Sequence, residues 1–331
     1  MGNGILLVDK PAGLTSFAVV DRVRAALGGQ LGFSPPKRRG RQRYKCGHAG
    51  TLDPLATGLL LLLCGSGTRL SPFLMKLDKA YRATVRFGVG TDSHDAEGRL
   101  TEQQQVSCTL PDLAAAMAGF CGEIQQVPPI FSAIKRAGQP LYKAARRGEE
   151  VEPPAPRPVR IDRLELLDSR WGVSAETTEL IAADGSIYEI DLELECSSGT
   201  YVRSLARDLA AAVGSVGTVT ALSRHRIGSY RLEDAVPPAA IDDGSRLVTA
   251  LQPLRSALPH LASLQLTPQE AALIRHGGQP EFSWLKRLDQ PPPLAQNTGS
   301  GEEQHFQMRD PGGALVAIGW LAGTGGLPRS A

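Results

Sequence analysis

The chain has 331 residues, with 36 lysines and arginines against 34 acidic residues and a hydrophobic fraction of 42%. This length fits two domains or one large domain with an appendage, and the apolar fraction excludes a wholly disordered chain. The longest aliphatic run, Leu59–Leu63, is far shorter than the roughly 18 residues of a membrane-spanning helix, so we expect no membrane segment. Five scattered cysteines without a CxxC pair, and no secretory signal, indicate reduced thiols in the cytoplasm and argue against a disulfide framework.

Hydrophobic periodicity predicts several elements in the first half of the chain. They are a strand at Ile5–Val8, a helix begun by Thr15 or Ser16 and ended by Gly28 and Gly29, a helix over Leu70–Leu77, a strand over Tyr81–Val89, and a helix over Leu110–Phe120 capped by Thr109. The run Leu59–Cys64 is either a buried strand or a helical segment, because periodicity alone does not separate the two.

The second half contains the clearest strand, Glu189–Cys196, in which apolar and acidic residues alternate. A helix over Val202–Val213 follows it, and a short helix at Leu266–Arg275 and a strand at Leu315–Leu321 lie near the end. Residues 290–304 are rich in Pro, Gly, Ser and Gln, which predicts a flexible loop. We therefore expect an α/β protein with a main domain at residues 1–250 and a small strand-rich domain at 255–331.

Two basic windows interrupt these elements, although the net charge is only +2. Residues 32–52 contain no acid and six basic residues, which are Lys37, Arg38, Arg39, Arg41, Arg43 and Lys45. The window is either a solvated loop or an arm that binds phosphates, and its composition favours neither interpretation. Residues 135–160 hold seven basic residues against three acids, and their prolines predict a largely irregular segment.

The sequence lacks the usual signatures of nucleotide and metal sites. It has no Walker A loop, no GxGxxG after a strand and no HExxH, so we expect neither a nucleotide cofactor nor a metal. The acidic segment Thr91–Gly98 could suggest calcium, but Ala96 interrupts the alternating oxygen ligands that such a loop requires. We interpret Thr91–Gly98 as a polar turn between two strands.

A glycine-rich loop at Gly47–Gly58 presents a single carboxylate, Asp53. Pro54 restricts the backbone of Asp53, so the loop should be stiff and exposed. The basic window before it should favour the ionised carboxylate. Most aspartates in such loops are turn residues or helix caps, but a carboxylate on a rigid loop can also act as a covalent nucleophile.

The corner between the strand ending at Cys196 and the following helix holds Tyr201 and Arg203. Because helix N-termini bind anions, these two residues could form a site. Taken by itself, the corner favours the simpler interpretation, in which Arg203 lies on the surface and Tyr201 packs against the sheet.

Taken together and in chain order, these segments resemble the TruB family of tRNA pseudouridine-55 synthases. The matching segments are Asp9–Ser16, Gly47–Leu60, Lys79–Arg82, Gly90–Asp92, Gln126–Lys135, Tyr142 with Ala145–Gly148, Cys196–Leu205, and Leu222–Arg224 with Arg226–Gly228. The resemblance covers residues 4 to 235, and only a loose similarity to a PUA-type RNA-binding domain follows. Phe131 stands where the family more often has Tyr, and the arm at residues 29–45 is longer than expected.

The resemblance implies a pseudouridine synthase fold, with a mixed and mainly antiparallel central sheet flanked by helices and loops, and a PUA-like C-terminal domain. It implies an enzyme without a cofactor or metal that detaches a flipped-out uracil in the T loop of tRNA and rejoins it through C5. Asp53 would be the nucleophile, attacking either C6 of the base or C1′ of the sugar. A monomer that binds the T arm is expected, with residues 130–158 closing over the RNA.

The resemblance also implies roles for individual residues. Arg203 would pair with Asp53, Tyr81 would stack on the base, and Tyr201 would line the pocket and serve in proton transfer. Further contacts to the substrate are expected from His48, Leu222, Lys10, Gly50, Thr51, Arg69, Lys135 and Arg146. Two alternatives are a tRNA-binding or tRNA-folding protein without catalysis, and a phosphatase. The phosphatase is disfavoured because Asp53 lacks a neighbouring Asp-x-Asp partner.

Overall fold

The computed structural model describes residues 2–33, 44–136, 138–149, 151–171, 187–290, 304–321 and 329–330. Most of the basic arm (34–43) and most of the loop expected at 290–304 lie outside the described residues. Within these ranges, no helix is both long and apolar enough to cross a membrane.

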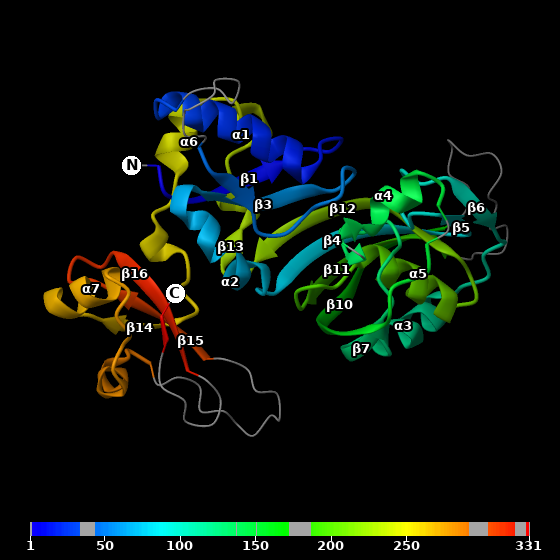
Figure 1. Cartoon of the computed structure of the whole chain (residues 1–331). Coiled ribbons are helices and arrows are strands. Elements are labelled where there is room, and N and C mark those ends of the chain that lie inside the picture. The colour runs from blue at the N-terminus through cyan, green and yellow to red at the C-terminus, as the bar shows by residue number, and fades with distance from the viewer. Residues whose placement is uncertain are drawn as a thin grey trace.

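A nine-stranded sheet forms the centre of the larger part of the molecule (Figure 1). Its main path runs, in spatial order, through β1 (Gly4–Lys10), β3 (Thr57–Cys64), β12 (Gly217–Ile227), β4 (Lys79–Phe87), β11 (Ile187–Cys196), β10 (Arg157–Trp171) and β7 (Gly122–Gln126). The short strands β2 (Cys46–His48) and β13 (Tyr230–Arg231) pair with β3 and β12. Among the described strands of this sheet, only β3 and β12 pair in parallel, so the expectation of a mixed, mainly antiparallel sheet is confirmed.

The strands β1 and β3 are buried on both faces, which explains their uninterrupted apolar sequences. One face packs against α1 (Ser16–Gln30) and α6 (Gly244–Ala250). The other face packs against α2 (Ser71–Met75) and against Leu258 and Ile318 from the C-terminal part of the chain. The ambiguous run Leu59–Cys64 is therefore a strand.

The other half of the sheet is covered on one face only. Helices α3 (Leu110–Ala118) and α5 (Val202–Ala212) pack on the apolar residues of β4, β11 and β12. The opposite face carries cross-strand ion pairs, such as Arg82 with Glu193 at 2.9 Å and Arg86 with Glu189 at 3.2 Å. This one-sided burial produces the alternation that predicted the strand at Glu189–Cys196.

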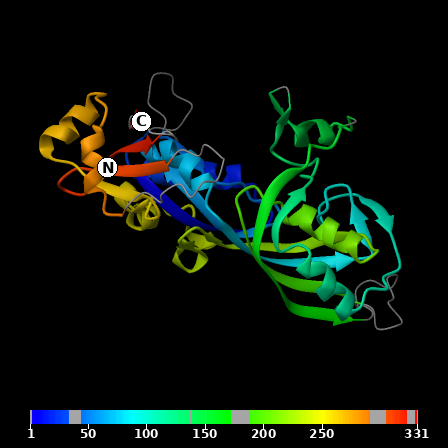
Figure 2. The ribbon, with the colours of Figure 1, turned by 90° about the horizontal axis from the view of Figure 1, so that it is seen from below.

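A separate four-stranded sheet forms the C-terminal part, seen at one end of the molecule in Figure 2. It consists of β14 (Ala262–Gln265), β15 (Gln304–Arg309), β16 (Leu315–Leu321) and β17 (Arg329–Ser330), with α7 (Pro268–Arg275) beside it. The Gln307 side chain donates to the carbonyls of Leu258 and Leu261, and the rings of Phe73 and His305 meet edge to face at 5.0 Å. These contacts join the small sheet to the larger part of the molecule.

Short elements connect the two sheets and their helices. They are the hairpin strands β5 (Val89–Thr91) and β6 (Leu100–Gln103), and the 3-10 turns η1 (Gly65–Leu70), η2 (Leu232–Asp234), η3 (Pro238–Ala240), η4 (Leu254–Ser256) and η5 (Phe282–Arg287). The segment between β5 and β6 is the polar turn expected from the sequence.

Three details differ from the sequence expectations. Helix α1 continues through Gly28 and Gly29 to Gln30, because Gly28 lies buried against Tyr44 rather than ending the helix. The helix expected over Leu70–Leu77 is shorter, because α2 covers only Ser71–Met75 and follows the 3-10 turn η1, which ends at Leu70. The window 135–160 is more ordered than its prolines suggested. It contains a hairpin of β8 (Lys135–Arg136) and β9 (Gln139–Pro140), α4 (Leu141–Arg146) and the start of β10.

Candidate active site

Asp53 lies in a tight turn between β2 and β3. The backbone N–H of Ala56 donates to the Asp53 carbonyl at 3.1 Å, and Pro54 occupies the second position of this turn, where its fixed φ is favourable. The Asp53 side chain is 32% exposed. The loop is thus well defined, as the sequence predicts, but it is mostly half-buried or buried and only Thr51 is exposed. The Asp53 carboxylate is still partly accessible to a ligand.

The N-terminal segment holds this turn from one side. Thr15 caps α1 by accepting a hydrogen bond from the Ala18 N–H at 3.0 Å, which leaves the neighbouring Ser16 hydroxyl free. Ser16 Oγ accepts from the backbone N–H of Leu52 at 2.7 Å and donates to the Leu52 carbonyl at 2.9 Å. The residue before Asp53 is therefore fixed through both of its backbone polar groups.

Lys10 also contacts the turn that carries Asp53. Its side chain is fully buried, and its ammonium donates to the carbonyls of Pro11, Leu14 and Pro54 at 2.8, 2.6 and 3.2 Å. Burial lowers the pKa of Lys10 to about 8. Lys10 was expected to bind substrate, but these contacts direct its ammonium to the protein's own carbonyls, which is a supporting position.

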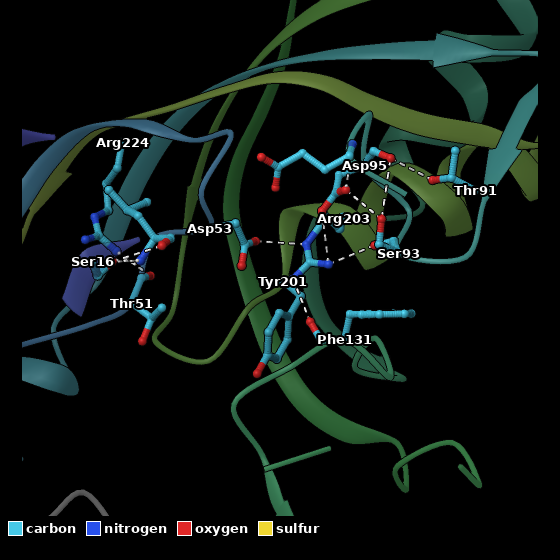
Figure 3. Close-up of polar contacts among 12 residues, drawn as sticks. Ser16, Thr51, Asp53, Thr91, Ser93, Asp95, Phe131, Tyr201, Arg203 and Arg224 are labelled. Atoms are coloured by element: carbon cyan, nitrogen blue, oxygen red, sulfur yellow. Dashed lines mark hydrogen bonds and ion pairs between the residues drawn. The ribbon is translucent and has the colours of Figure 1, made fainter. Parts of the chain in front are cut away.

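Arg224 of β12 fixes the start of the loop (Figure 3). It is buried and donates to the carbonyls of Leu59, Gly50 and Thr51 at 2.8, 3.1 and 3.4 Å. Gly50 has φ of +120°, a conformation that L side chains rarely adopt. Gly50 and Thr51, both expected to contact substrate, therefore direct their carbonyls to Arg224, while the Thr51 residue itself is exposed.

Arg203 projects from the first turn of α5 toward Asp53 (Figure 3). Its Nε lies 2.9 Å from Asp53 Oδ2, and its Nη1 lies 3.2 Å from Asp95 Oδ2. The guanidinium also donates to the carbonyls of Ser93 and Phe131 at 2.8 and 2.9 Å. With a side chain only 4% exposed, Arg203 is a buried cation between two carboxylates, and the surface position favoured by the isolated motif is wrong.

Asp95 is the main site residue that the sequence interpretation missed. It lies in the turn between β5 and β6, and its side chain is 5% exposed. Its Oδ1 accepts from Ser93 Oγ at 2.6 Å and from the Glu97 N–H at 3.1 Å, and its carbonyl accepts from Thr91 Oγ1 at 2.8 Å. The acidic segment Thr91–Gly98 was the available signal, but sequence did not show that this turn reaches Arg203.

Burial and nearby charges determine the electrostatics of Asp53. Burial raises the pKa of the Asp53 carboxyl above its usual value, the Arg203 guanidinium opposes this, and the Asp95 charge adds to the rise. The basic residues of the window that was expected to favour the ionised form lie mostly outside the described residues. Among the described groups, desolvation outweighs the nearby cation. Arg203 is the cation that keeps the carboxylate form accessible.

Comparisons with known proteins show the family to which the chain belongs. Residues 37–202 match the profile described as "TruB family pseudouridylate synthase (N terminal domain)". The "tRNA pseudouridine synthase B" of Aromatoleum aromaticum is 41% identical over 277 residues, covering 83% of this chain and 80% of that protein. The chain belongs to the TruB family of pseudouridylate synthases. The protein of the same name from Ruegeria sp. is 42% identical over 278 residues, covering 83% and 82%.

Solved structures show the same fold at lower identity. A crystal structure of a Cbf5-Nop10-Gar1 complex aligns with a TM-score of 0.67 and 22% identity, covering 99% of this chain and 83% of that chain. An archaeal box H/ACA sRNP Nop10-Cbf5 complex aligns with a TM-score of 0.63 and 20% identity, covering 99% and 84%. The expected pseudouridine synthase fold, with a strand-rich C-terminal sheet, is confirmed.

The aromatic residues expected from the TruB resemblance lie near the Asp53–Arg203 pair. Tyr201 is the N-cap of α5, and its backbone N–H and carbonyl pair with the Gln126 side chain at 2.8 and 3.1 Å. The Arg157 guanidinium lies over the half-buried Tyr201 ring, 4.9 Å from its centroid. Tyr81 of β4 is 8% exposed, and burial raises the pKa of its phenol.

Two further residues expected from the TruB resemblance, Leu222 and His48, lie on strands β12 and β2. Leu222 is a buried residue of β12 opposite Ala83 of β4. His48 is half-buried in β2, and its Nδ1 has no hydrogen-bond partner among the described residues. Burial, and then the Arg224 charge, lower the pKa of His48, so its imidazole is neutral at pH 7.

Two other expected substrate residues, Arg69 and Lys135, do not join this cluster. Arg69 is exposed at the end of η1, Lys135 is exposed in β8, and Arg146 ends α4. No ion pair between described residues links Arg69 or Lys135 to Asp53. Across the described part of the chain, no three His, Cys, Asp or Glu side chains group closely enough to hold a metal ion.

Proposed function

We propose that this TruB-family chain converts uridine 55 in the T loop of tRNA into pseudouridine, with Asp53 as the nucleophile. The observation that carries the proposal is the Asp53–Arg203 ion pair, in which the carboxylate is accessible and the guanidinium is buried. The names of the curated relatives, tRNA pseudouridine synthase B, support tRNA as the class of substrate.

The overall reaction is an isomerisation, so it consumes no co-reactant. The bond between N1 of the base and C1′ of the ribose breaks, the uracil rotates, and a bond from C5 to C1′ forms. The C5 proton leaves and N1 gains a proton. Asp53 forms a temporary covalent bond, to C6 of the base or C1′ of the sugar, that keeps the substrate bound during the exchange.

Arg203 acts on Asp53 rather than on the RNA, because its polar atoms are directed to Asp53, Asp95 and two backbone carbonyls. A planar guanidinium holds a carboxylate in a defined orientation, and its charge opposes the rise in the Asp53 pKa that burial causes. Arg203 therefore keeps the nucleophile both ionised and oriented.

The uridine must leave the stacked loop to reach Asp53. Flipping a base costs a few kcal/mol, and stacking on an aromatic ring recovers about 1–3 kcal/mol. We propose that Tyr81 stacks on the flipped base, that Leu222 forms the floor beneath it, and that the half-buried Tyr201 borders it and takes part in proton transfer. Tyr81 and Leu222 sit on neighbouring strands, β4 and β12, so they can contact the same base.

Recognition of the tRNA would involve surfaces outside the Asp53 turn. We propose that Lys135 and Arg146, in the segment of residues 130–158, contact phosphates of the T arm, together with Arg69 of η1. The C-terminal sheet is proposed as a PUA-like RNA-binding domain. We also propose that the protein acts as a cytoplasmic monomer, since neither the reaction nor the site requires a second copy.

The decisive experiment compares the wild-type protein with Asp53→Asn on a T-arm RNA and maps pseudouridine. The amide cannot act as nucleophile, so we expect no product, whereas tRNA affinity should stay within a few fold. Asp242→Asn, which removes an exposed carboxylate paired with Arg22, is the control and should keep full activity. Appreciable pseudouridine formation by Asp53→Asn would overturn the assignment.

The alternative of a non-catalytic tRNA-binding or tRNA-folding protein is not favoured. The curated relatives are named as synthases, and the chain retains both members of the ion pair. Refolding of tRNA by Asp53→Asn would show a second role beside catalysis.

A further inference from the structure

Two cysteines that are distant from the Asp53–Arg203 pair face each other across β2 and β3. Cys46 and Cys64 are direct partners in the antiparallel register, and their Sγ atoms are 4.0 Å apart. Cys64 is buried and Cys46 is half-buried. Nothing in the spacing of the five scattered cysteines predicts that these two pair.

The hydrogen bonds of the ladder show which kind of pair this is. The Gly65 N–H donates to the Lys45 carbonyl at 2.8 Å, and the Ala49 N–H donates to the Leu61 carbonyl at 2.9 Å. Hydrogen-bonded and non-hydrogen-bonded pairs alternate along an antiparallel ladder. Cys46 and Cys64 therefore form a non-hydrogen-bonded pair, in which the Cα atoms approach to about 4.5 Å. That spacing is compatible with a disulfide.

We propose that Cys46 and Cys64 are a thiol–disulfide site that a peroxide oxidises to a reversible cross-strand disulfide. One thiolate attacks a peroxide oxygen, the O–O bond breaks, and a sulfenic acid and hydroxide form. The second thiol then displaces the sulfenic oxygen, the S–S bond forms, and water leaves. Two thiols lose two electrons in total, and one hydrogen peroxide becomes two waters.

The surroundings of the pair support this chemistry. The hydrogen bond between the two thiols lowers the pKa of the Cys64 thiol, which favours its thiolate, and raises the pKa of the Cys46 thiol. Only side-chain rotation is needed to bring the sulfurs together, because the strand register already fixes the backbones. Two of the other three thiols have different neighbours: Cys108 Sγ contacts the Thr109 carbonyl, and Cys121 Sγ contacts the Met117 carbonyl.

The disulfide would fasten β2 to β3 and enclose the whole segment that carries His48 and Asp53. The contacts that orient Asp53 come from Arg203 and from the residues around Ser16 and Lys10, none of which involves either sulfur. The oxidised protein should therefore keep its activity and resist unfolding better. The cross-link thus protects the loop and does not switch the enzyme off.

The test treats the intact protein with hydrogen peroxide and then measures free thiols, mass, disulfide-linked peptides and Tm. We expect the loss of two of the five thiols, a mass decrease of two hydrogens, one linked peptide pair containing Cys46 and Cys64, and a higher Tm that dithiothreitol reverses. Cys46→Ser should show no cross-link and no rise in Tm. Cys121→Ser, which removes an exposed thiol, should behave like the wild type.

Three results would overturn the proposal. The first is the absence of the Cys46–Cys64 peptide under conditions that oxidise other thiols of the protein. The second is an unchanged Tm after the cross-link has formed. The third is loss of pseudouridine formation in the cross-linked protein. The thiol and peptide measurements do not depend on the proposed function, so failure of one proposal is distinguishable from failure of the other.

Discussion

Asp95 contacts Arg203 through Nη1 at 3.2 Å, on the other end of the guanidinium from the Nε that contacts Asp53. One buried cation therefore serves two carboxylates, of which Asp53 is accessible and Asp95 is not. The Ser93 hydroxyl and the Glu97 N–H hold Asp95, so the turn between β5 and β6 fixes the orientation of Arg203. Asp95 is thus a positioning residue for the Asp53 site.

Arg203→Lys should lower turnover strongly. A lysine ammonium cannot contact Asp53 and Asp95 at opposite ends while also reaching the carbonyls of Ser93 and Phe131. Because small displacements of a reacting group are costly, we expect the single-turnover rate to fall about 100-fold. Binding of T-arm RNA, measured by filter retention, should change little. A near-normal rate would remove Arg203 from the site.

Asp95→Asn should alter the pH dependence of the reaction. The Asp95 charge raises the pKa of Asp53, so its removal should lower that pKa and move the acid limb of the single-turnover rate to lower pH. Arg203→Met removes the charge that lowers the Asp53 pKa and should move the same limb to higher pH.

The matched control is Asp92→Asn in the same turn, where Asp92 Oδ1 accepts from the Arg99 N–H at 2.9 Å. This variant should leave the acid limb in place. If Asp95→Asn and Arg203→Met shift the limb in the same direction, Asp53 is not the titrating group.

Arg224→Met should weaken both the fold and the Asp53 loop. The variant leaves the carbonyls of Leu59, Gly50 and Thr51 without their donor, so we expect a loss of about 3 kcal/mol in the free energy of unfolding. Urea denaturation measures this loss, and kcat should fall in the same variant because Thr51 is two residues before Asp53. Arg226→Met, which removes a partly exposed partner of Glu195, should cost much less. Equal losses in the two variants would contradict the role of Arg224.

Lys10→Met should change how stability depends on pH. Burial lowers the pKa of Lys10 from its usual 10.5 to about 8, so the unfolded chain binds more protons than the folded chain between these values. Lys10 therefore makes stability increase as pH rises through this window. In Lys10→Met, the increase in the free energy of unfolding from pH 8 to pH 10 should be smaller. Lys79, whose burial also lowers its pKa to about 8, supplies the part that remains.

The local features of this protein could be predicted from its sequence. Thr109 and Thr267 begin their helices through capping boxes, and the alternation at Glu189–Cys196 gives a strand with one buried face. The Gly- and Pro-rich segment around Asp53 forms the expected turn. Capping, alternation and turn chemistry depend on residues a few positions apart, so the sequence contains them directly. The order of the motifs along the chain indicated the TruB family, and this resemblance in turn implied that Asp53 is the nucleophile.

The tertiary structure decided which distant residues meet. Leu59–Cys64 is a strand because apolar layers cover both of its faces. Lys10 can be buried because its ammonium donates to backbone carbonyls, one of them Pro54, which is distant in the sequence. Asp95 reaches Arg203, and Cys46 reaches Cys64, only because the sheet order and register bring them together. The same pairing of distant segments partly buries Asp53, so desolvation sets the direction of its pKa shift. No local pattern contains that pairing, so the sequence around Asp53 did not reveal the effect of burial on its pKa.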